Sequence, residues 1–251
     1  MLTKLKTSAA ISIILASGLL TSCADAGPST NMSKAEIETI VKDYILANPK
    51  IIREAFSLLQ DQEKKQKVTE TKTAIKTLSK EIFYDQRDFS IGPKDAKVTI
   101  VEFFDYNCTF CKSSAAWVKH IMDDYPKDVR VIFKELPILE ARTKTSRNAA
   151  IAAMAAGRQG KYKDLHFALM NGSKLSENFI IAKAKAVGLN MTQFTKDRKD
   201  IELQKHLEAT ITLTRGIPAL TGTPFFIIND EYVPGGNTAK LQTKLEEHLS
   251  K

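Results

Sequence analysis

The chain has 251 residues, which is enough for one sizeable domain with additions or for two small domains. It carries 37 Lys and Arg against 29 Asp and Glu, a net charge of +8, and 43% of its residues are hydrophobic. Because the basic residues are spread along the chain without an arginine-rich stretch or interleaved aromatics, we predict no nucleic-acid partner. Three cysteines are too few for the disulfide framework of a small secreted scaffold, and two of them form one Cys-x-x-Cys pair.

Residues 1–22 have the features of an export signal peptide. Two lysines precede an apolar stretch over residues 9–20, which is too short to span a bilayer as a stable helix. The next residues, Leu-Thr-Ser-Cys, resemble a bacterial lipobox, in which Cys23 becomes the lipid-modified first residue. Ordinary cleavage after Ala26, at a small-x-small site, is the alternative. Either route predicts an exported protein in a compartment where disulfides persist.

Residues 23–84 are predicted to form a tether and a helical extension. Ser33 and Glu36 have the spacing of a capping box, and apolar residues follow at helical intervals. Asn48 and Pro49 end this helix and can start another, whose middle is polar on all sides. Because such a long helix buries itself poorly alone, its apolar stripes either pair between copies in a homo-oligomer, which we favour, or dock onto the chain's own catalytic domain.

Residues 98–112 read as a strand, a sharp turn and the start of a helix. The strand is apolar apart from Glu102, and Cys108 and Cys111 follow at the turn. At the first turn of a helix, free backbone N–H groups and the helix dipole stabilise a thiolate on Cys108. A reactive thiol beside a second thiol predicts disulfide exchange. A buried Glu102, whose pKa would be raised, is expected to carry a proton to or from Cys111, and the alternative is a side chain that reaches solvent at the strand end. Asp105, nearer the turn, is expected to be exposed or to cap the helix.

A static disulfide or half of a zinc site is the competing interpretation of the cysteine pair. Zinc requires about two further ligands. The four histidines, His120, His166, His206 and His248, do not have the spacing of a zinc site, and no second cysteine pair exists. We therefore predict no metal and no cofactor.

The rest of the chain predicts an α/β domain over residues 85–251. A second strand at 129–134 would pair with the first in a βαβ unit. A helical tract of four or five helices follows at about 142–215. Two more strands and a final helix end the chain, and Thr223 and Pro224 stand directly before the first of these strands.

The run Glu-Phe-Phe-Asp-Tyr-x-Cys-x-x-Cys-Lys after an apolar strand resembles the DsbA-like branch of the thioredoxin superfamily. The similarity covers roughly residue 89 to the C-terminus. It implies a thioredoxin fold interrupted by a helical insertion, preceded here by an N-terminal helical extension of the kind that joins subunits in some relatives. These relatives are thiol:disulfide oxidoreductases of the bacterial cell envelope, which implies a periplasmic location.

The resemblance also assigns roles to individual residues. Cys108 is the nucleophile, Cys111 the resolving cysteine and Glu102 the proton relay. Pro224 is the cis-proline of the loop beside the cysteines, and Thr223 before it offers its backbone to the substrate. The dipeptide Thr109-Phe110 departs from the Pro-His of the strongest oxidants, so we expect a lowered pKa for Cys108 without the family's extreme.

The predicted function is therefore an enzyme that forms or isomerises disulfides in exported proteins. Its partners would be exported proteins with cysteines or disulfides and a membrane redox protein that resets the cysteine pair. The alternative is an envelope lipoprotein that serves as a chaperone or copper-binding module, with the thiols as ligands.

Overall fold

The computed structural model describes residues 32–172 and 175–251 of the chain. The predicted signal peptide and the predicted lipidation site Cys23 lie outside the described residues. The chain divides into two compact units, with the border between Phe56 and Ser57. Among the described residues, no helix is long and apolar enough to cross a membrane.

The first unit contains helix α1 (Lys34–Ala47) and the start of helix α2 (Lys50–Thr77). The predicted capping box is present at the start of α1. The Ser33 hydroxyl accepts from the backbone N–H of Glu36, and the Glu36 carboxylate accepts from the backbone N–H of Ser33. No residue of α1 is buried, and most of its large apolar side chains are exposed: Ile37, Ile40, Val41, Tyr44 and Leu46.

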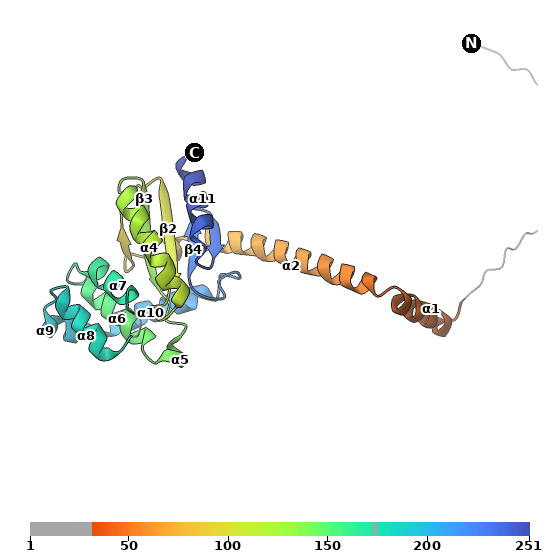
Figure 1. The fold of residues 1–251 in the computed structure, drawn as a ribbon, viewed down its shortest axis with the longest axis horizontal. Coiled ribbons are helices and arrows are strands. Elements are labelled where there is room, and N and C mark those ends of the chain that lie inside the picture. Colours follow the sequence, from red (N-terminus) through yellow and green to blue (C-terminus); the bar gives the residue numbers. More distant parts are fainter. Residues whose placement is uncertain (1–31, 173–174) are drawn as a thin grey trace, which may run out of the picture. The chain divides into compact units, whose positions relative to one another are not determined.

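The second unit is built around a five-stranded mixed sheet with the strand order β1-β3-β2-β4-β5 (Figure 1). The strands are β1 (Phe89–Ile91), β2 (Val98–Phe104), β3 (Val129–Glu135), β4 (Phe225–Ile228) and β5 (Glu231–Pro234). β2 and β3 are parallel and are joined by helix α4 (Thr109–Asp124), whereas the other neighbours are antiparallel. This is the predicted βαβ unit followed by a β-hairpin, and helix α11 (Thr238–Leu249) ends the unit.

The helical insertion between β3 and β4 contains six helices in the described residues, more than the four or five expected. They are α5 (Glu140–Thr143), α6 (Ser146–Gly157), α7 (Tyr162–Met170), α8 (Glu177–Ala186), α9 (Met191–Asp197) and α10 (Ile201–Thr214). The extra helix is α5, a single turn that begins directly after the loop leaving β3. Side chains of Ser176, Asn190 and Asp200 cap three of the helices and divide the tract into short pieces.

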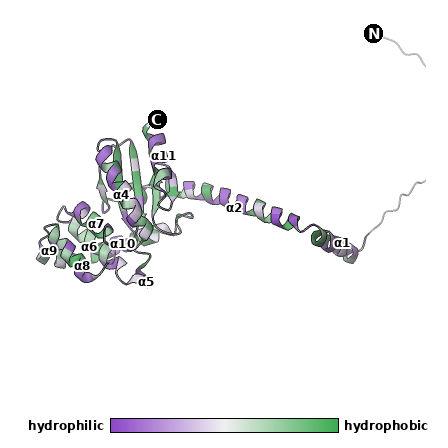
Figure 2. Cartoon of the chain, in the orientation of Figure 1, coloured by the Kyte–Doolittle hydropathy of each residue, from purple (hydrophilic) through white to green (hydrophobic). Residues whose placement is uncertain are grey.

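Two hydrophobic cores lie on opposite faces of the sheet. Alternate residues of β2 point to opposite sides, so Ile100 and Phe104 belong to one core, and Val101 and Phe103 belong to the other. The first core is shared with α4, α6, α7 and α11, and the second with the end of α2 and with α3 (Ser79–Phe83). Figure 2 shows the strands as the most continuously hydrophobic elements of this unit, with hydrophilic residues on the outer helices.

The C-terminal part of α2 belongs to the second unit. Thr71 and Ile75 are buried there, and the Thr71 hydroxyl oxygen accepts from the backbone N–H of Ala219 at 3.1 Å. Earlier in the same helix, Ile52 and Phe56 are exposed. The docking alternative therefore holds for the end of the extension, which packs onto the catalytic domain. The beginning of the extension has exposed apolar side chains, and its pairing between copies stays a prediction. The compact unit starts well before residue 85, the predicted start of the catalytic domain.

Candidate active site

Cys108 lies at the N-terminal cap of α4, directly after the turn that follows β2. Its backbone N–H donates to the carbonyl oxygen of Asp105 at 3.0 Å, and its own carbonyl accepts from the N–H of Lys112 at 3.0 Å. No side chain caps this helix. The backbone N–H groups of Phe110 and Cys111 are therefore available to the Cys108 sulfur, and their hydrogen bonds favour its thiolate.

The two thiols have opposite acid strengths. A hydrogen bond from the Cys111 thiol is the main reason that the pKa of Cys108 is lowered to about 6, against the opposing effect of burial. Burial is the main reason that the pKa of Cys111 is raised far above its ordinary value, and the hydrogen bond to Cys108 raises it further. At neutral pH Cys108 is therefore a thiolate and Cys111 a thiol, which is the division that thiol–disulfide exchange requires.

Glu102 is 1% exposed and lies on β2 within the sheet. Burial, and then the negative charge of Cys108, raise the pKa of this carboxyl group to about 8. Among the described residues neither carboxylate oxygen has a partner at hydrogen-bonding geometry, and the nearby hydroxyl of Ser114 lowers the pKa only in part. The Glu102 charge in turn raises the pKa of Cys111. Glu102 therefore keeps its proton at neutral pH and lies close enough to Cys111 for their charges to interact.

The loop before β4 reaches the same place. The peptide bond between Thr223 and Pro224 is cis, and the Thr223 carbonyl oxygen lies 3.2 Å from the Cys108 sulfur. Hydrogen bonding by the Thr223 side chain lowers the pKa of Cys108. The fold therefore brings together the five residues named from the sequence for this site: Cys108, Cys111, Glu102, Thr223 and Pro224.

Asp105 differs from the expectation. The sequence suggested an exposed carboxylate or a helix cap, but Asp105 is 2% exposed and does not cap α4. It accepts from the backbone N–H of Asn107 at 2.7 Å, the backbone N–H of Leu139 at 2.9 Å and the hydroxyl of Ser146 at 2.8 Å. Two of these donors lie more than 30 residues away, so no local pattern reveals them. Asp105 fixes the turn before Cys108 against the start of the helical insertion.

Three further residues lie near the thiols: Phe110, noted from the sequence as a departure from the strongest oxidants, and Lys112 and Gly236, which were not identified from it. Phe110 between the cysteines is 68% exposed, an apolar side chain beside the nucleophile. Lys112 donates to the carbonyl oxygen of Gly172 and is close enough to Cys108 to feel its charge. Gly236 packs so closely that an added Cβ would lie 3.0 Å from the carbonyl oxygen of Phe110. The loop after β5 thus abuts the cysteine pair.

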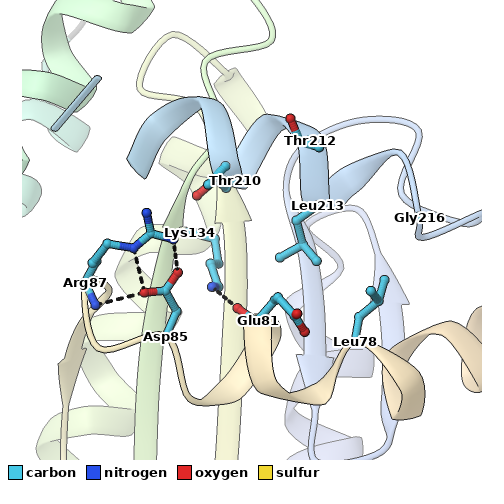
Figure 3. Close-up of a pocket in the computed structure, with 10 residues that line it drawn as sticks. Leu78, Glu81, Asp85, Arg87, Lys134, Thr210, Thr212, Leu213 and Gly216 are labelled. Carbon is cyan, nitrogen blue, oxygen red and sulfur yellow. Dashed lines mark hydrogen bonds and ion pairs between the residues drawn. The ribbon is translucent and has the colours of Figure 1, made fainter. Parts of the chain in front are cut away.

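A second group of charged residues lies away from the thiols, at the edge of a cavity of about 400 Å³ (Figure 3). The ligand atoms of Asp85, Asp88 and His206 lie within 4.8 Å of one another, a spacing that suits a metal ion. However, Arg87 forms a two-pronged ion pair with Asp85, and the buried Lys134 pairs with Asp88. These cations already compensate both carboxylates, so the group is explained as an ion-pair network.

Comparison with known protein families decides the membership of the chain. A profile described as a DSBA-like thioredoxin domain matches residues 99–249. The chain belongs to the DsbA-like thioredoxin family. This confirms the predicted fold, and it confirms at the level of the family the predicted enzyme class, thiol:disulfide oxidoreductase. A second profile, the N-terminal domain of the copper resistance protein ScsC, matches residues 34–66, within the helical extension.

Solved structures of DsbA-like and related proteins are similar to the chain. A thioredoxin-like oxidoreductase from Silicibacter pomeroyi is 34% identical, with a TM-score of 0.62, and the match covers 68% of this chain and 98% of that one. A linker-deletion mutant of Proteus mirabilis ScsC is 26% identical, with a TM-score of 0.65 over 88% of this chain and 99% of that one. The thiol-disulfide exchange protein α-DsbA2 from Wolbachia pipientis is 28% identical, with a TM-score of 0.64 over 70% and 95%.

Some curated relatives of this DsbA-like chain are much longer. Na(+)/H(+) antiporter NhaA 3 from Salinispora tropica is 27% identical over 144 residues, which is 57% of this chain and 22% of the antiporter. The chain therefore spans about a fifth of the length of that relative, and the match concerns only a part of it. Antiport is not transferred to this chain.

Proposed function

We propose that this chain forms or isomerises disulfides in exported proteins of the bacterial cell envelope, with Cys108 and Cys111 as its redox pair. The observation that carries the proposal is the opposite shift of the two pKa values at the start of α4, to about 6 for Cys108 and upward for Cys111. A structural cysteine pair has no need of a stabilised thiolate, whereas an exchange catalyst uses it as nucleophile and leaving group.

In the oxidising direction, a substrate thiolate attacks the Cys108 sulfur of the Cys108–Cys111 disulfide. The disulfide breaks, and Cys111 leaves as a thiolate that takes up a proton. A second substrate thiolate then attacks the substrate sulfur of the mixed disulfide, and Cys108 leaves as a thiolate. The substrate loses two electrons and gains a disulfide, while the enzyme is reduced. In isomerisation, the reduced enzyme starts the cycle with an attack by the Cys108 thiolate on a substrate disulfide.

Glu102 serves as the proton relay in this proposal. Cys111 takes up a proton after it leaves the disulfide as a thiolate, and its thiol must lose that proton before it can attack a mixed disulfide. Glu102 has a pKa of about 8, is buried and interacts electrostatically with both cysteines. It therefore holds a proton at neutral pH and can exchange it with Cys111 without exposing the site to bulk water.

Thr223 and Pro224 form the proposed substrate-binding edge. Since the Thr223 carbonyl oxygen lies 3.2 Å from the nucleophilic sulfur, a substrate strand whose backbone pairs with Thr223 brings its own sulfur to Cys108. Because Pro224 has no N–H group, it does not compete with Thr223 for the backbone of the substrate, and the edge stays open. The exposed ring of Phe110, between the two cysteines in the sequence, is available for an apolar contact with the substrate.

The proposed location is the periplasm, with a lipid on Cys23 as the proposed anchor. The support is the export signal in the sequence and the similarity to a periplasmic thioredoxin-like protein from Salmonella enterica. Exported proteins would be the substrates, and a membrane redox protein would reset the pair. The exposed apolar residues of α1 support a homo-oligomer, because water disfavours so large an apolar helical face.

Two assays test the function on the mature chain. We expect catalysis of insulin reduction and of the refolding of scrambled ribonuclease, both abolished by Cys108→Ala. Cys111→Ala should instead accumulate mixed disulfides on non-reducing gels, because the resolving thiol is gone.

Thiol trapping in cells determines the direction of the reaction, since a mostly oxidised cysteine pair indicates an oxidase and a mostly reduced pair an isomerase. If Cys108→Ala leaves both activities intact, the proposal is wrong.

A copper-binding or chaperone module is the competing function. It is favoured by the match of residues 34–66 to a domain named after a copper resistance protein. Thiolates are the ligands that Cu(I) prefers. Tight Cu(I) binding that needs both cysteines, together with no insulin reduction, would support this function in place of exchange.

A further inference from the structure

A buried polar cluster lies behind the active-site turn, and none of its members takes part in the exchange reaction described above. Glu135 ends β3, and its Oε1 accepts hydrogen bonds from the hydroxyls of Tyr106 at 3.1 Å and Tyr162 at 2.7 Å. The Tyr106 hydroxyl also lies 3.0 Å from Nδ1 of His166. All four side chains belong to buried residues. One oxygen of the Glu135 carboxyl group, whose pKa burial raises well above its usual value, is thus the shared acceptor for two phenols.

The hydrogen bonds of the cluster fix the direction of its protons. Burial lowers the pKa of His166 to about 3, so its imidazole is neutral. A phenol has a single hydrogen, which Tyr106 gives to Glu135, so the N–H group at Nδ1 of His166 donates to the Tyr106 oxygen. The ring of His166 is held in place by edge contacts with Phe104 and Phe167. The Tyr106 hydroxyl therefore donates to Glu135 and accepts from His166, and both partners are buried and held in place.

The cluster joins three elements that the sequence keeps far apart. Tyr106 lies in the active-site turn, two residues before Cys108. Glu135 lies on β3, and Tyr162 and His166 lie on α7 of the helical insertion. Among them, only Tyr106 reaches the turn that carries the nucleophile. Tyr162 instead stacks on Phe89 of β1, with ring centroids 4.2 Å apart.

We propose that Glu135 is a positioning residue for thiol–disulfide exchange, and that it acts through Tyr106 to hold the Cys108 turn against β3 and the helical insertion. Helix α4 stabilises the Cys108 thiolate only if the sulfur stays over its first N–H groups. Asp105 holds the turn through Ser146, and Tyr106 holds it through Glu135. The inference rests on the proposed role of Cys108 as the nucleophile.

The two tyrosines provide a matched pair of variants. Tyr106→Phe and Tyr162→Phe each remove one phenol hydroxyl that donates to the same oxygen, and neither changes the ring. The measurements are the rate of Cys108 alkylation by iodoacetamide against pH in the full mature chain, with Cys108→Ala to identify the signal, and urea unfolding. We expect Tyr106→Phe to lose more stability than Tyr162→Phe, because it also leaves the N–H group of His166 without its acceptor. We expect the alkylation rate at pH 6 to fall about fivefold in Tyr106→Phe, the factor that corresponds to one net hydrogen bond.

Two Glu135 variants separate positioning from charge. Glu135→Gln keeps an oxygen that accepts from both tyrosines, whereas Glu135→Leu has none. If Glu135 positions the turn, Glu135→Leu behaves as Tyr106→Phe, and Glu135→Gln restores most of the alkylation rate. The proposal is overturned if Tyr106→Phe and Tyr162→Phe have equal alkylation profiles, or if Glu135→Gln is as impaired as Glu135→Leu.

The same experiment distinguishes this inference from the proposed function. If the unmodified chain shows an ordinary thiol pKa for Cys108 and no insulin reduction, the exchange function itself fails. If the unmodified chain behaves as proposed and only the tyrosine variants cannot be told apart, the function stands and the positioning role of Glu135 fails alone.

Discussion

The buried carboxyl group of Glu102 and the buried thiol of Cys111 are electrostatically coupled, so that the negative charge of Glu102 raises the pKa of Cys111. Glu102 itself has a pKa raised to about 8, first by burial and then by the charge of Cys108. Three ionisable groups therefore share one low-dielectric site, in which a proton on Glu102 makes it easier for both sulfurs to carry negative charge.

The first prediction concerns the nucleophile. Alkylation of Cys108 should follow a pKa of about 6, because the Cys111 thiol, the Thr223 side chain and the amides of α4 all stabilise the thiolate. The thiolate is present above this pH and is lost below it. A pH series of iodoacetamide rates measures this, with Cys108→Ala to identify the signal. An apparent pKa at the free-cysteine value of about 8.5 would contradict the placement of Cys108 at the helix N-terminus.

The second prediction concerns proton transfer. Glu102→Gln should slow the resolution of mixed disulfides by about tenfold or more, since general acid–base groups contribute at least that much where proton transfer limits the rate. Alkylation of Cys108 should remain fast, because the helix amides are untouched. Stopped-flow decay of an enzyme–glutathione mixed disulfide measures the step. An unchanged resolution rate between pH 6 and pH 8 would exclude Glu102 as the relay.

The third prediction concerns stability against pH. Glu102 has a pKa of about 8 in the folded chain. In an unfolded chain the value is about 4.3. The folded state therefore keeps a proton that the unfolded state releases, and stability falls as pH rises from about 4.3 to about 8. Removing this group should flatten the pH dependence of the unfolding free energy in that window by up to about 1.4 kcal/mol per pH unit.

Urea unfolding of the unmodified chain and of Glu102→Gln at a series of pH values checks this slope. The buried amide of the variant carries its own desolvation penalty, which is the same at every pH. The difference in slope is therefore the informative quantity, and parallel curves would show that Glu102 is not a protonated buried acid.

The fourth prediction compares two isoleucines in helix α2. Ile75 is 3% exposed in the second core, whereas Ile52 is 42% exposed. Ile75→Ala should lower the unfolding free energy by about 2–5 kcal/mol, the range for large-to-small core substitutions. Ile52→Ala should change it little. Equal effects of the two substitutions would contradict the docking of the end of α2. Removal of the residues up to Lys80 should also destabilise the catalytic unit, because it removes Ile75 from the second core.

The fifth prediction concerns self-association. Ile40 is 54% exposed on the apolar face of α1. If this face joins copies of the chain, Ile40→Asp should shift the mass measured by light scattering to that of a monomer, because a charge in the interface is costly to bury. Insulin reduction should persist. Thr39→Asp, on the exposed neighbouring position, is the matched control. A mature chain that is monomeric at micromolar concentration would refute the oligomer.

The local chemistry of this protein follows from residues that are neighbours in the sequence. They specify the order of strand, Cys-x-x-Cys pair and helix, the capping box of α1 and the proline before β4. These patterns are short-range, because the physical preferences of strands, helix ends and turns are expressed within a few residues. Such patterns predict an α/β domain with a reactive cysteine pair, whereas the thioredoxin fold, the enzyme class and the roles of the site residues follow from the resemblance to the DsbA-like family.

The meeting of distant groups, in contrast, depends on the tertiary fold. The burial of Asp105 depends on Leu139 and Ser146, more than 30 residues along the chain. The link from Tyr106 to Glu135 depends on the parallel pairing that sets Phe104 opposite Glu135. In both cases the carboxylate is buried because donors arrive from other elements, and a buried acceptor is tolerated only where such donors are supplied. That requirement is met in three dimensions and leaves no periodic pattern in the sequence.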